Sequence, residues 1–589
     1  MEKLKKLQHT VDICVVGGGM AGLSAAVAAA RHGASVLIMQ DRPMFGGNAS
    51  SEVRMWVCGA HGENNRETGI VEEIMLDSFY RNPYANYSIW DSILFEKVRF
   101  QPGLDYLLNC SCLDAQMDGT RIVSITGWQL TTQTFHTVRA NLFIDCSGDS
   151  ILAPLTGAQY RRGREGRDEF GEDIAPQQPD QKTMGMSCLI QVREHTKPRS
   201  YTPPAWAEPF TAEKLIHRMP DPMDKNENYW YLELGGEQDE IADTERIRDE
   251  LQDVAYGVWD FVKNSGTYPS ETVERLDVDW IGVLPGKRES RRYVGDVIMT
   301  QHDVRSGGHF EDLIAYGGWT MDDHHPAGLR TSEEPTIFHP APSPFGIPYR
   351  ALYSVNIENL MFAGRNISVT HSALSATRVM ATCATVGQAA GTAAALAVTR
   401  SETPRGLYQN HLKELQQQLM DDDCYLPFNK RPVSDLTASA VVESDQPGAE
   451  NLRNGLDRPI GDTDNGWRGR PGSSVQYTFP ELSPIRQIRL VFDSDLNRET
   501  LPEEKKYNRP MQAGYFLNDQ PMHVPKTLIR DYRIDFLDAS DNWQTLCTVQ
   551  GSYQRLQVHA VSVSAKAVRF VPLKTWGSED FHIFAFDVS

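Results

Sequence analysis

The sequence predicts an α/β body with an inserted α+β cap and a C-terminal all-β sandwich. Three observations predict this fold: a strand–helix–strand pattern over residues 11–39, an insertion of about two hundred residues before a returning strand near residue 360, and short alternating strands beyond residue 420. A chain of 589 residues is too long for one core, so about two to four domains are expected. We place the domain boundaries so that the body comprises 1–150 and 351–425, the cap 151–350 and the sandwich 426–589.

Composition narrows the class of protein. The net charge is −20, from 58 basic and 78 acidic side chains, which argues against a nucleic acid as partner. Nine cysteines without a C-x-x-C pair indicate neither a zinc ribbon nor a redox dithiol, and reduced cysteines fit a reducing compartment. The apolar runs at 11–16 and 384–398 are too short for a signal peptide and a membrane span, respectively. We therefore expect a soluble, cytoplasmic protein with no membrane partner.

The N-terminal pattern is specific. The apolar, mostly β-branched run 11–16 suits a strand buried on both faces, and an alanine-rich helix ending at Gly33 follows a glycine loop. A second apolar strand covers 35–39. This order of strand, G-x-G-x-x-G, helix and strand is that of a Rossmann dinucleotide-binding unit, in which backbone N–H groups at the helix N-terminus face the pyrophosphate. The predicted contacts in the loop are Gly17, Gly19, Met20, Ala21 and Gly22.

The segment after the second strand indicates which dinucleotide binds. Gln40 stands where an acid usually contacts the ribose, and Asp41 follows it, so both are candidate ribose contacts. The run 42–52, RPMFGGNASSE, resembles the R-P-x-x-G-G-N-A-S-S-E run of a family of FAD-dependent oxidoreductases related to fumarate reductase and glutathione reductase. This resemblance implies FAD as cofactor, with further contacts from Arg42, Gly46, Gly47, Asn48, Ala49 and Ser50.

Two later segments extend the resemblance over about residues 11–400. The strand and turn at 142–149 end in S-G-D, similar to the family's A-T-G-D, and 359–366 is a strand running into G-R-N, where many relatives carry aspartate in place of the arginine. A helix expected at about 376–399 contains interior glycines, which predict close backbone packing, and in the family its N-terminus points at the flavin ring. The contacts implied here are Ser147, Gly148, Asp149, Gly364, Arg365 and Gly387.

Proton transfer beside a flavin is a task suited to histidine. The segment 317–326 is similar to the family's G-G-W-x-x-D-x-H stretch and predicts His324 as the base with Asp322 as its partner. His371, before the long helix, and His61, after the second flavin segment, are further candidates, and His61 could also attach the flavin covalently. The alternative for each is an ordinary hydrogen-bonded histidine.

Basic side chains offer a second kind of contact. Arg350 and Arg378 could anchor a substrate carboxylate or an oxyanion. The stretch 286–292, GKRESRR, is also similar to one in the family, and ion pairing with its own Glu289 is an equal alternative there. Asp322, His324 and His325 lack a spaced fourth ligand, so we predict no metal site.

The C-terminal region reads as a β-sandwich because seven alternating runs recur between 474 and 588. Its opening, 448–469, resembles galactose-binding or discoidin-like sandwiches found beside carbohydrate-active enzymes. That resemblance implies sugar binding. A structural sandwich that packs on the catalytic body, or that makes a homo-oligomer contact, is the favoured alternative.

These observations together predict an FAD-dependent oxidoreductase that removes hydride from a CH–OH group of a small sugar or polyol. The first alternative is carbon–carbon dehydrogenation or reduction of a carboxylate-bearing substrate, with Arg350 and Arg378 as the clamp. The second is a flavin-containing glycan-binding protein without catalysis. The electron acceptor stays open, since no second G-x-G-x-x-G follows a strand. If the sandwich is a separate unit, a chain ending near residue 425 should still bind flavin.

Overall fold

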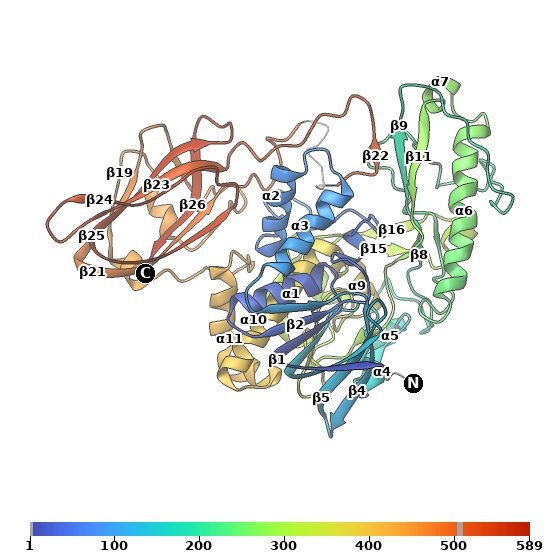
Figure 1. The fold of residues 1–589 in the computed structure, drawn as a ribbon, viewed down its shortest axis with the longest axis horizontal. Helices are drawn as coiled ribbons and strands as arrows, with labels where there is room; N and C mark the ends of the chain where they lie inside the picture. Colours follow the sequence, from blue (N-terminus) through green and yellow to red (C-terminus); the bar gives the residue numbers. More distant parts are fainter. Residues whose placement is uncertain (1–3, 503–510) are drawn as a thin grey trace. The chain divides into compact units, whose positions relative to one another are not determined.

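The computed structural model describes residues 4–502 and 511–589 and divides into two compact units (Figure 1). The first unit comprises Met1–Ala60, Ala85–Leu415 and Arg509–Gln520. The second comprises His61–Tyr84, Gln416–Asn508 and Pro521–Ser589. Each unit is therefore assembled from segments that lie far apart in the sequence.

The first unit is built on a seven-stranded sheet whose central strands are parallel, as the buried apolar runs predict. A β4–β5 hairpin continues the sheet antiparallel to the first half of β6. The strand order is β3 (Leu104–Leu107), β2 (Val36–Met39), β1 (Lys5–Val16), β6 (Thr134–Asp145), β5 (Arg121–Gln129) and β4 (Cys110–Asp118), with β18 (Leu360–Phe362) also paired to β6. The predicted Rossmann-type α/β fold is confirmed.

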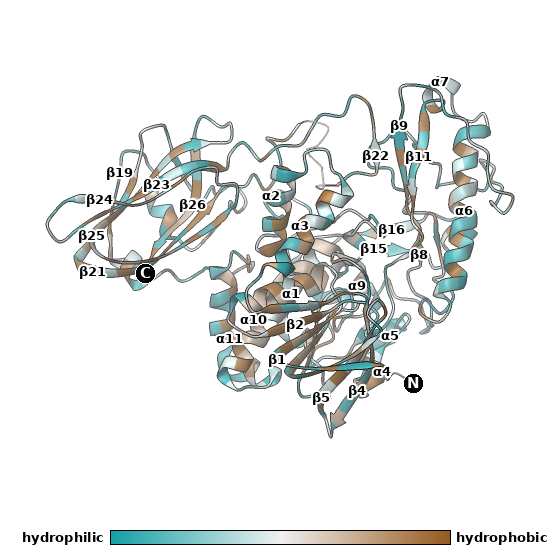
Figure 2. Ribbon diagram, viewed as in Figure 1, coloured by the Kyte–Doolittle hydropathy of each residue, from teal (hydrophilic) through white to brown (hydrophobic). Residues whose placement is uncertain are grey.

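Two apolar helices pack on each other over this sheet: α1 (Met20–Arg31) and α10 (Met380–Arg400). A Cβ at Gly387 would lie 2.1 Å from the backbone O of Ala21, and one at Gly391 would lie 2.0 Å from that of Ala25. The close backbone packing predicted from these glycines is therefore confirmed. Among the described residues, α10 is the one helix long and apolar enough to cross a membrane; 94% of its apolar window is buried inside the protein, so it is a core helix (Figure 2).

The helix predicted at about 376–399 begins later than expected. Two helices cover the region, α9 (His371–Thr377) and α10, and Val379 between them is extended, with φ −66° and ψ 146°. Arg378 at this break directs its guanidinium to Asp322, donating from Nη2 to the backbone O at 3.1 Å and to Oδ2 at 3.0 Å. The predicted helix start was wrong because a tertiary contact interrupts a locally favourable sequence.

The cap consists of small sheets of two or three short strands and one long helix, α6 (Thr244–Asn264), whose apolar face joins a core with Ile190 and Val192. The strands are β7 (Tyr160–Arg161), β8 (Met186–Ser187), β9 (Ile190–Glu194), β10 (Glu233–Leu234), β11 (Leu276–Ile281), β12 (Gly286–Lys287), β13 (Arg292–Tyr293), β14 (Leu313–Gly317), β15 (Met321–His324), β16 (Thr336–His339), β17 (Phe345–Pro348) and β22 (Gly514–Tyr515). The smaller helices of this unit include α3 (Tyr87–Arg99), α4 (Leu152–Thr156), α5 (Arg167–Phe170), α7 (Ser270–Val273) and α8 (Gln301–Arg305). The strand β22 comes from the C-terminal region and pairs parallel with β9.

The second unit contains the predicted sandwich, an all-antiparallel arrangement of seven strands. Register shifts interrupt the pairing of its two longest strands, for example between Thr478 and Ser483, and each strand continues past the shift. The strands are β19 (Val441–Ser444), β20 (Trp467–Gly469), β21 (Val475–Phe492), β23 (Ile529–Leu537), β24 (Trp543–Val549), β25 (Leu556–Thr575) and β26 (Phe581–Val588). The helices α11 (Pro404–Asp421) and α12 (Asp435–Ser439) precede them.

A segment from the N-terminal part of the chain completes the second unit. It carries α2 (Ile70–Arg81), in which Glu72 forms a two-bond ion pair with Arg498 at 2.5 and 3.0 Å; both side chains are 1% exposed. Tyr80 stacks on Tyr553 with ring centroids 4.1 Å apart. Because a buried carboxylate needs such a partner, α2 and the sandwich residues stabilise each other.

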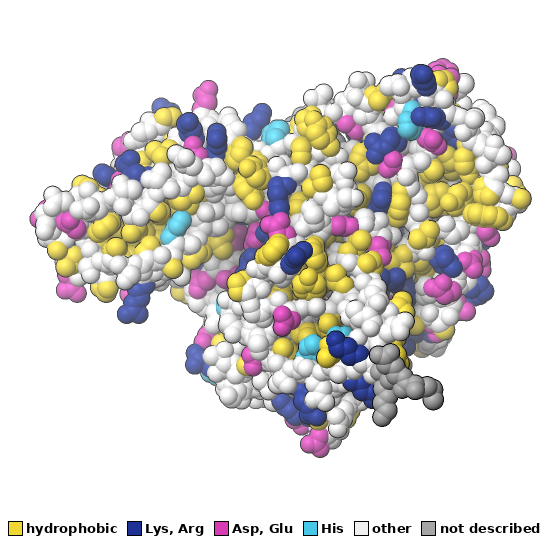
Figure 3. Space-filling view, in the orientation of Figure 1, with side chains coloured by type: hydrophobic (Ala, Val, Ile, Leu, Met, Phe, Trp, Pro, Cys, Tyr) yellow, Lys and Arg dark blue, Asp and Glu magenta, His cyan; other side chains and the backbone are white. Residues whose placement is uncertain are grey.

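The surface carries charges of both signs. Figure 3 shows lysine and arginine interspersed with aspartate and glutamate over the visible face. Apolar side chains lie between them, as on most protein surfaces.

Candidate functional site

The glycine loop between β1 and α1 has the geometry of an anion cradle. Gly17 has φ +98°, and a Cβ there would lie 2.4 Å from the backbone O of Cys146. A Cβ at Gly22 would lie 1.8 Å from the O of Gly17, so both positions need glycine for close packing. At Gly19, by contrast, the nearest described atom to a Cβ is the Cα of Gly47, 3.9 Å away. A Cβ at Gly19 would therefore make only an ordinary van der Waals contact, so the backbone is uncrowded at the N-terminus of α1, where the helix dipole favours phosphate.

The second flavin segment folds over this loop. Gly46, with φ +111°, donates from its N–H to the O of Gly18 at 2.8 Å. The next residues, Gly47–Ala49, form a 3₁₀ turn that includes Asn48, and Met20 and Ala21 open α1 beneath them. The sequence predicted that both segments contact one cofactor, and the structure brings them together.

Polar side chains of this region hold the loop in shape. Gln40 accepts from the N–H of Gly18 at 2.7 Å and donates to the O of Met44 at 3.2 Å. Asn48 donates to the O of Lys287 at 3.0 Å, and Ser50 donates to the O of Gly47 at 2.7 Å. These contacts link the cap and the loop around the cradle. Asp41 is exposed and lies 3.8 Å from the guanidinium of Arg42.

The third and fourth segments meet beside the first turn of α1. Ser147 donates from N–H and hydroxyl to Asp145, and Gly148 has φ +77°. A Cβ at Gly148 would lie 2.7 Å from the guanidinium carbon of Arg365. A Cβ at Gly364 would lie 3.5 Å from the Cβ of Ala21, so the turn carrying Arg365 borders the cradle.

Asp149 joins these segments to the cap. Its carboxylate contacts Arg365 Nη2 at 2.8 Å and Lys287 Nζ at 2.8 Å, and it accepts from the hydroxyl of Ser290 at 2.8 Å. Burial alone would raise the pKa of Asp149, but the two cations hold it at about 2. Asp149 is therefore ionised throughout the neutral range.

These features fit FAD. The uncrowded backbone at Gly19, the α1 N-terminus with no acid in its first turn and the cations Lys287 and Arg365 suit a diphosphate. Within the described chain, no side chain caps the N-terminus of α10, whose dipole favours negative charge. Gly387 lies on the face of α10 that packs against α1.

A buried polar cluster surrounds the predicted base. His324, which is 3% exposed, lies 2.6 Å from Glu233 Oε2 through Nδ1 and 3.3 Å from Asp322 Oδ2 through Nε2. The ring of Trp230 meets the imidazole edge-on, with centroids 5.2 Å apart. The structure thus places Asp322 beside His324, together with a second, closer carboxylate.

Both carboxylates of the cluster stay ionised. Asp322 is buried, but His324 and Arg378 hold its pKa well below the usual range, and Thr336 donates to Oδ1 at 2.6 Å. Burial likewise opposes ionisation of Glu233, yet Arg288, 3.6 Å away, and His324 lower its pKa. Neither carboxylate is a good proton acceptor, because each is already stabilised in its charged form.

The opposite face of β15 holds a separate charged network. Asp323, between Asp322 and His324, contacts His371 Nε2 at 3.1 Å, and Glu289 contacts His371 Nδ1 at 2.9 Å. Arg292 pairs with Glu289 at 2.8 Å. Burial would lower the pKa of His371, but Glu289 and Asp323 raise it to about 10. His371 is therefore a cation held on both ring nitrogens at neutral pH.

Two other predicted residues have different surroundings. Arg350 forms a two-bond ion pair with Asp312, at 2.9 and 3.0 Å, and covers the ring of Tyr408. His61 is exposed and belongs to the second unit. The structure therefore gathers His324, Asp322 and Arg378, with His371 behind β15 through Asp323.

Sequence reasoning missed Glu233, the closest partner of His324. It comes from β10, 91 residues before His324, and the two meet only in the folded cap. One signal was present: Glu233 is a single charge inside the apolar run Tyr231-Leu232-Glu233-Leu234. A buried acid in such a run needs a partner.

An apolar cluster adjoins the polar one. It contains Trp56, Cys58, Val379 and Ala513, with Met55 and Trp319 packed against it. Val379 follows Arg378 in sequence, and Trp319 comes just before β15. Trp319, from the stretch 317–326, therefore lies in a group of apolar side chains, two residues before β15 begins.

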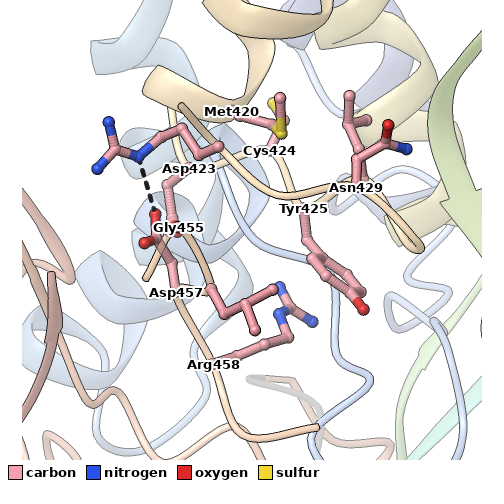
Figure 4. Close-up of a pocket in the computed structure, with 11 residues that line it drawn as sticks. Met420, Asp423, Cys424, Tyr425, Asn429, Gly455, Asp457 and Arg458 are labelled. Atoms are coloured by element: carbon pink, nitrogen blue, oxygen red, sulfur yellow. Dashed lines mark ion pairs between the residues drawn. The ribbon is translucent and has the colours of Figure 1, made fainter. Parts of the chain in front are cut away.

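The second unit has a depression of its own beside the sandwich (Figure 4). The guanidinium carbon of Arg458 lies 4.0 Å from the ring centroid of Tyr425, and Arg431 and Asp457, which also line the depression, form an ion pair. The cavity volume is about 20 Å³, which holds about one water molecule. It is too small for a sugar.

In the ranges 4–502 and 511–589, no group of three or more His, Cys, Asp or Glu side chains could hold a metal ion.

Comparisons with known proteins extend this picture. None of the curated protein sequences matches the chain. Among solved structures, it is similar to a family 32 carbohydrate-binding module from Streptococcus pneumoniae EndoD (15% identity, TM-score 0.20, covering 26% of this chain and 99% of the module). A family 32 module from C. perfringens NanJ in complex with galactose gives 8% identity and TM-score 0.19, covering 26% of this chain and 97% of that one. L-proline dehydrogenase from P. horikoshii gives 15% identity and TM-score 0.17, and the match covers 25% of this chain and 24% of that one.

At these identities and scores, none of the structural similarities bears on the substrate. The family comparison is decisive about the class of protein. The family model described as FAD dependent oxidoreductase matches residues 12–419, which include the glycine loop, the later flavin segments and the cap. The chain belongs to the FAD-dependent oxidoreductase family.

Proposed function

We propose that this oxidoreductase oxidises a CH–OH group of a sugar or polyol and that His324 is the general base. The observation that supports the proposal is the unequal pair of contacts around His324: 2.6 Å to Glu233 and 3.3 Å to Asp322. A short contact at one ring nitrogen fixes the tautomer, and a long one at the other is easily exchanged for a substrate hydroxyl.

With His324 as the base, oxidation of the CH–OH group proceeds by one proton transfer and one hydride transfer. The hydroxyl proton passes to His324 Nε2, the hydrogen on the same carbon leaves with both bonding electrons, and the C–O bond becomes C=O. FAD, when bound, supplies the acceptor for that hydride. Glu233 stabilises the imidazolium that results, through the 2.6 Å contact at Nδ1.

The surroundings of His324 suit a polyhydroxylated substrate. Carboxylates and guanidinium groups can exchange hydrogen bonds with several hydroxyls, while Trp230, Trp56 and Trp319 offer faces for C–H groups. A carboxylate substrate is disfavoured because the two predicted clamp residues are already neutralised. Arg378 is paired with Asp322, and Arg350 is paired with Asp312.

The test is the anaerobic reductive half-reaction, followed by the loss of visible flavin absorbance in a panel of sugars and polyols. We expect bleaching by at least one member, and a rate lowered about 10²–10⁴-fold in His324→Gln with unchanged FAD content. His302→Gln, a change at an exposed histidine of α8, is the control. Full-rate reduction of His324→Gln would remove it as the base; re-oxidation of reduced flavin by unsaturated acids, without bleaching by any polyol, would replace the proposed reaction.

A further inference from the structure

Asp149 holds two cations at the edge of the cofactor cradle, and one carboxylate cannot neutralise both. Lys287 contacts one oxygen and Arg365 the other, each at 2.8 Å. Asp149, Lys287 and Arg365 together therefore carry a net charge of +1, since the pKa of Asp149 is held at about 2. Among the described residues, no acceptor is present for the buried Nε of Arg365.

Backbone contacts place this group beside the diphosphate position. The turn of Arg365 begins at Gly364, which borders Ala21 in the first turn of α1. Lys287 is anchored from the other side, because its O accepts from Asn48 in the loop that covers Gly19. Both cations are therefore attached to segments that shape the cradle.

We propose that Lys287 and Arg365 bind the diphosphate of FAD and that Asp149 positions them there. Two phosphates carry two negative charges, and a net cation near them adds attraction to that of the α1 amides. The carboxylate keeps both side chains in place but opposes the bound anion. This inference concerns retention of the cofactor and is independent of the proposed substrate.

The test measures the FAD dissociation constant of flavin-free protein at low salt, from the quenching of FAD fluorescence. Arg365→Gln and Lys287→Gln should each weaken binding about tenfold or more, because each removes a charge-assisted hydrogen bond. Asp149→Asn should weaken binding less than either, since it removes a negative charge from the cradle. Raising the salt concentration should narrow the difference between wild type and the cation variants.

A matched control distinguishes a direct contact with the diphosphate from a purely structural ion pair. Arg164 and Asp180 in the cap form a pair with nearly equal exposure, 19% and 28%, against 18% and 29% for Arg365 and Asp149. Arg164→Gln should bind FAD within about twofold of wild type, because the pair it removes has Asp180 as its carboxylate and not Asp149.

Two results would overturn the proposal: wild-type affinity in both cation variants, or a loss in Asp149→Asn as large as theirs. The second would mean that the three residues act only as a structural unit. If Arg365→Gln does not fold, Arg365→Lys is measured in its place. It keeps the charge, so wild-type affinity within about threefold supports the proposal and a loss of tenfold or more contradicts it.

Discussion

His324 in the first unit and His582 in the second are both buried between two carboxylates, yet their contacts differ. His582 lies 2.9 Å from Asp493 through Nδ1 and 2.8 Å from Asp464 through Nε2, but only the contact to Asp493 has the geometry of a hydrogen bond. His324 has one short and one long contact, at 2.6 and 3.3 Å. A position between two acids therefore does not by itself identify a base. We propose His324 for that role because both of its ring nitrogens make hydrogen bonds and the longer one, to Asp322, can be exchanged for a substrate hydroxyl.

Buried arginines of both units contact carboxylates and backbone oxygens. In the second unit, Arg555 donates to the backbone O of Phe492 and of Asp457, and Arg498 donates to those of Ser494 and Asp495, so these side chains tie loops together. In the first unit, Arg378 also contacts a carboxylate beside the candidate base. Arg218 of the first unit likewise donates to the backbone O of Gly328 and of Glu333, so Arg378 is distinguished by its place beside the candidate base and not by the kind of contact it makes.

The largest effect is expected from removing the second unit's strands. A chain ending at residue 425 would leave Glu72 without Arg498 and Tyr80 without Tyr553, and the first unit would lose β22 and Ala513. We expect this truncated chain to be proteolysed within 61–84 and not to retain FAD, because an unpaired buried carboxylate is strongly destabilising. Limited proteolysis and flavin absorbance check this. A yellow, protease-resistant product would show that the two units are separable after all.

The next largest effect is expected from Gly19→Val, which should weaken FAD binding without disturbing the fold. Gly19 has φ −65°, which any residue adopts, and its Cβ position is uncrowded, so the fold should tolerate valine. The branched side chain would occupy the space facing the α1 amides, and we expect FAD binding to fall by at least about a hundredfold, close to 3 kcal/mol. Absorbance at purification and the melting temperature of the flavin-free protein are the two measurements. Stoichiometric flavin in the variant would contradict the assignment of the cradle.

The parts of the molecule predictable from sequence are those fixed by local pattern. The loop from Gly17 to Gly22 is recognisable because strand, glycines and helix follow one another within thirty residues or so. The pairing of His324 with Asp322 was also within reach, since they are two residues apart on β15 and point the same way.

Other features depend on contacts between distant segments. Glu233 and Arg288 reach His324 from different parts of the cap, and residues 61–84 join strands more than four hundred positions later. His371 follows the third flavin segment in sequence, but Asp323 draws it to the far side of β15. Periodicity and turn chemistry carry no information about such pairings.

The smallest expected effect is on the pH dependence of stability, and it sharpens the comparison among the histidines that lie between two carboxylates. The pKa of His371 is raised to about 10 from an ordinary value of 6.5, so its contribution to stability is complete below about pH 6.5 and is lost as the pH rises through 10. The charged groups facing it, Glu289 and Asp323, stay ionised over this range. Wild type should therefore lose more unfolding free energy between pH 6.5 and 10 than His371→Gln does.

Chemical denaturation at a series of pH values measures this difference, with His302→Gln as the control. His582→Gln should behave like His371→Gln, because Asp464 and Asp493 outweigh burial and raise the pKa of His582 as well. Equal pH slopes in wild type and His371→Gln would mean that the imidazole is neutral between its two carboxylates. In that case an uncharged histidine would lie next to β15, and His371 would return as a candidate for the proton transfer that we assign to His324.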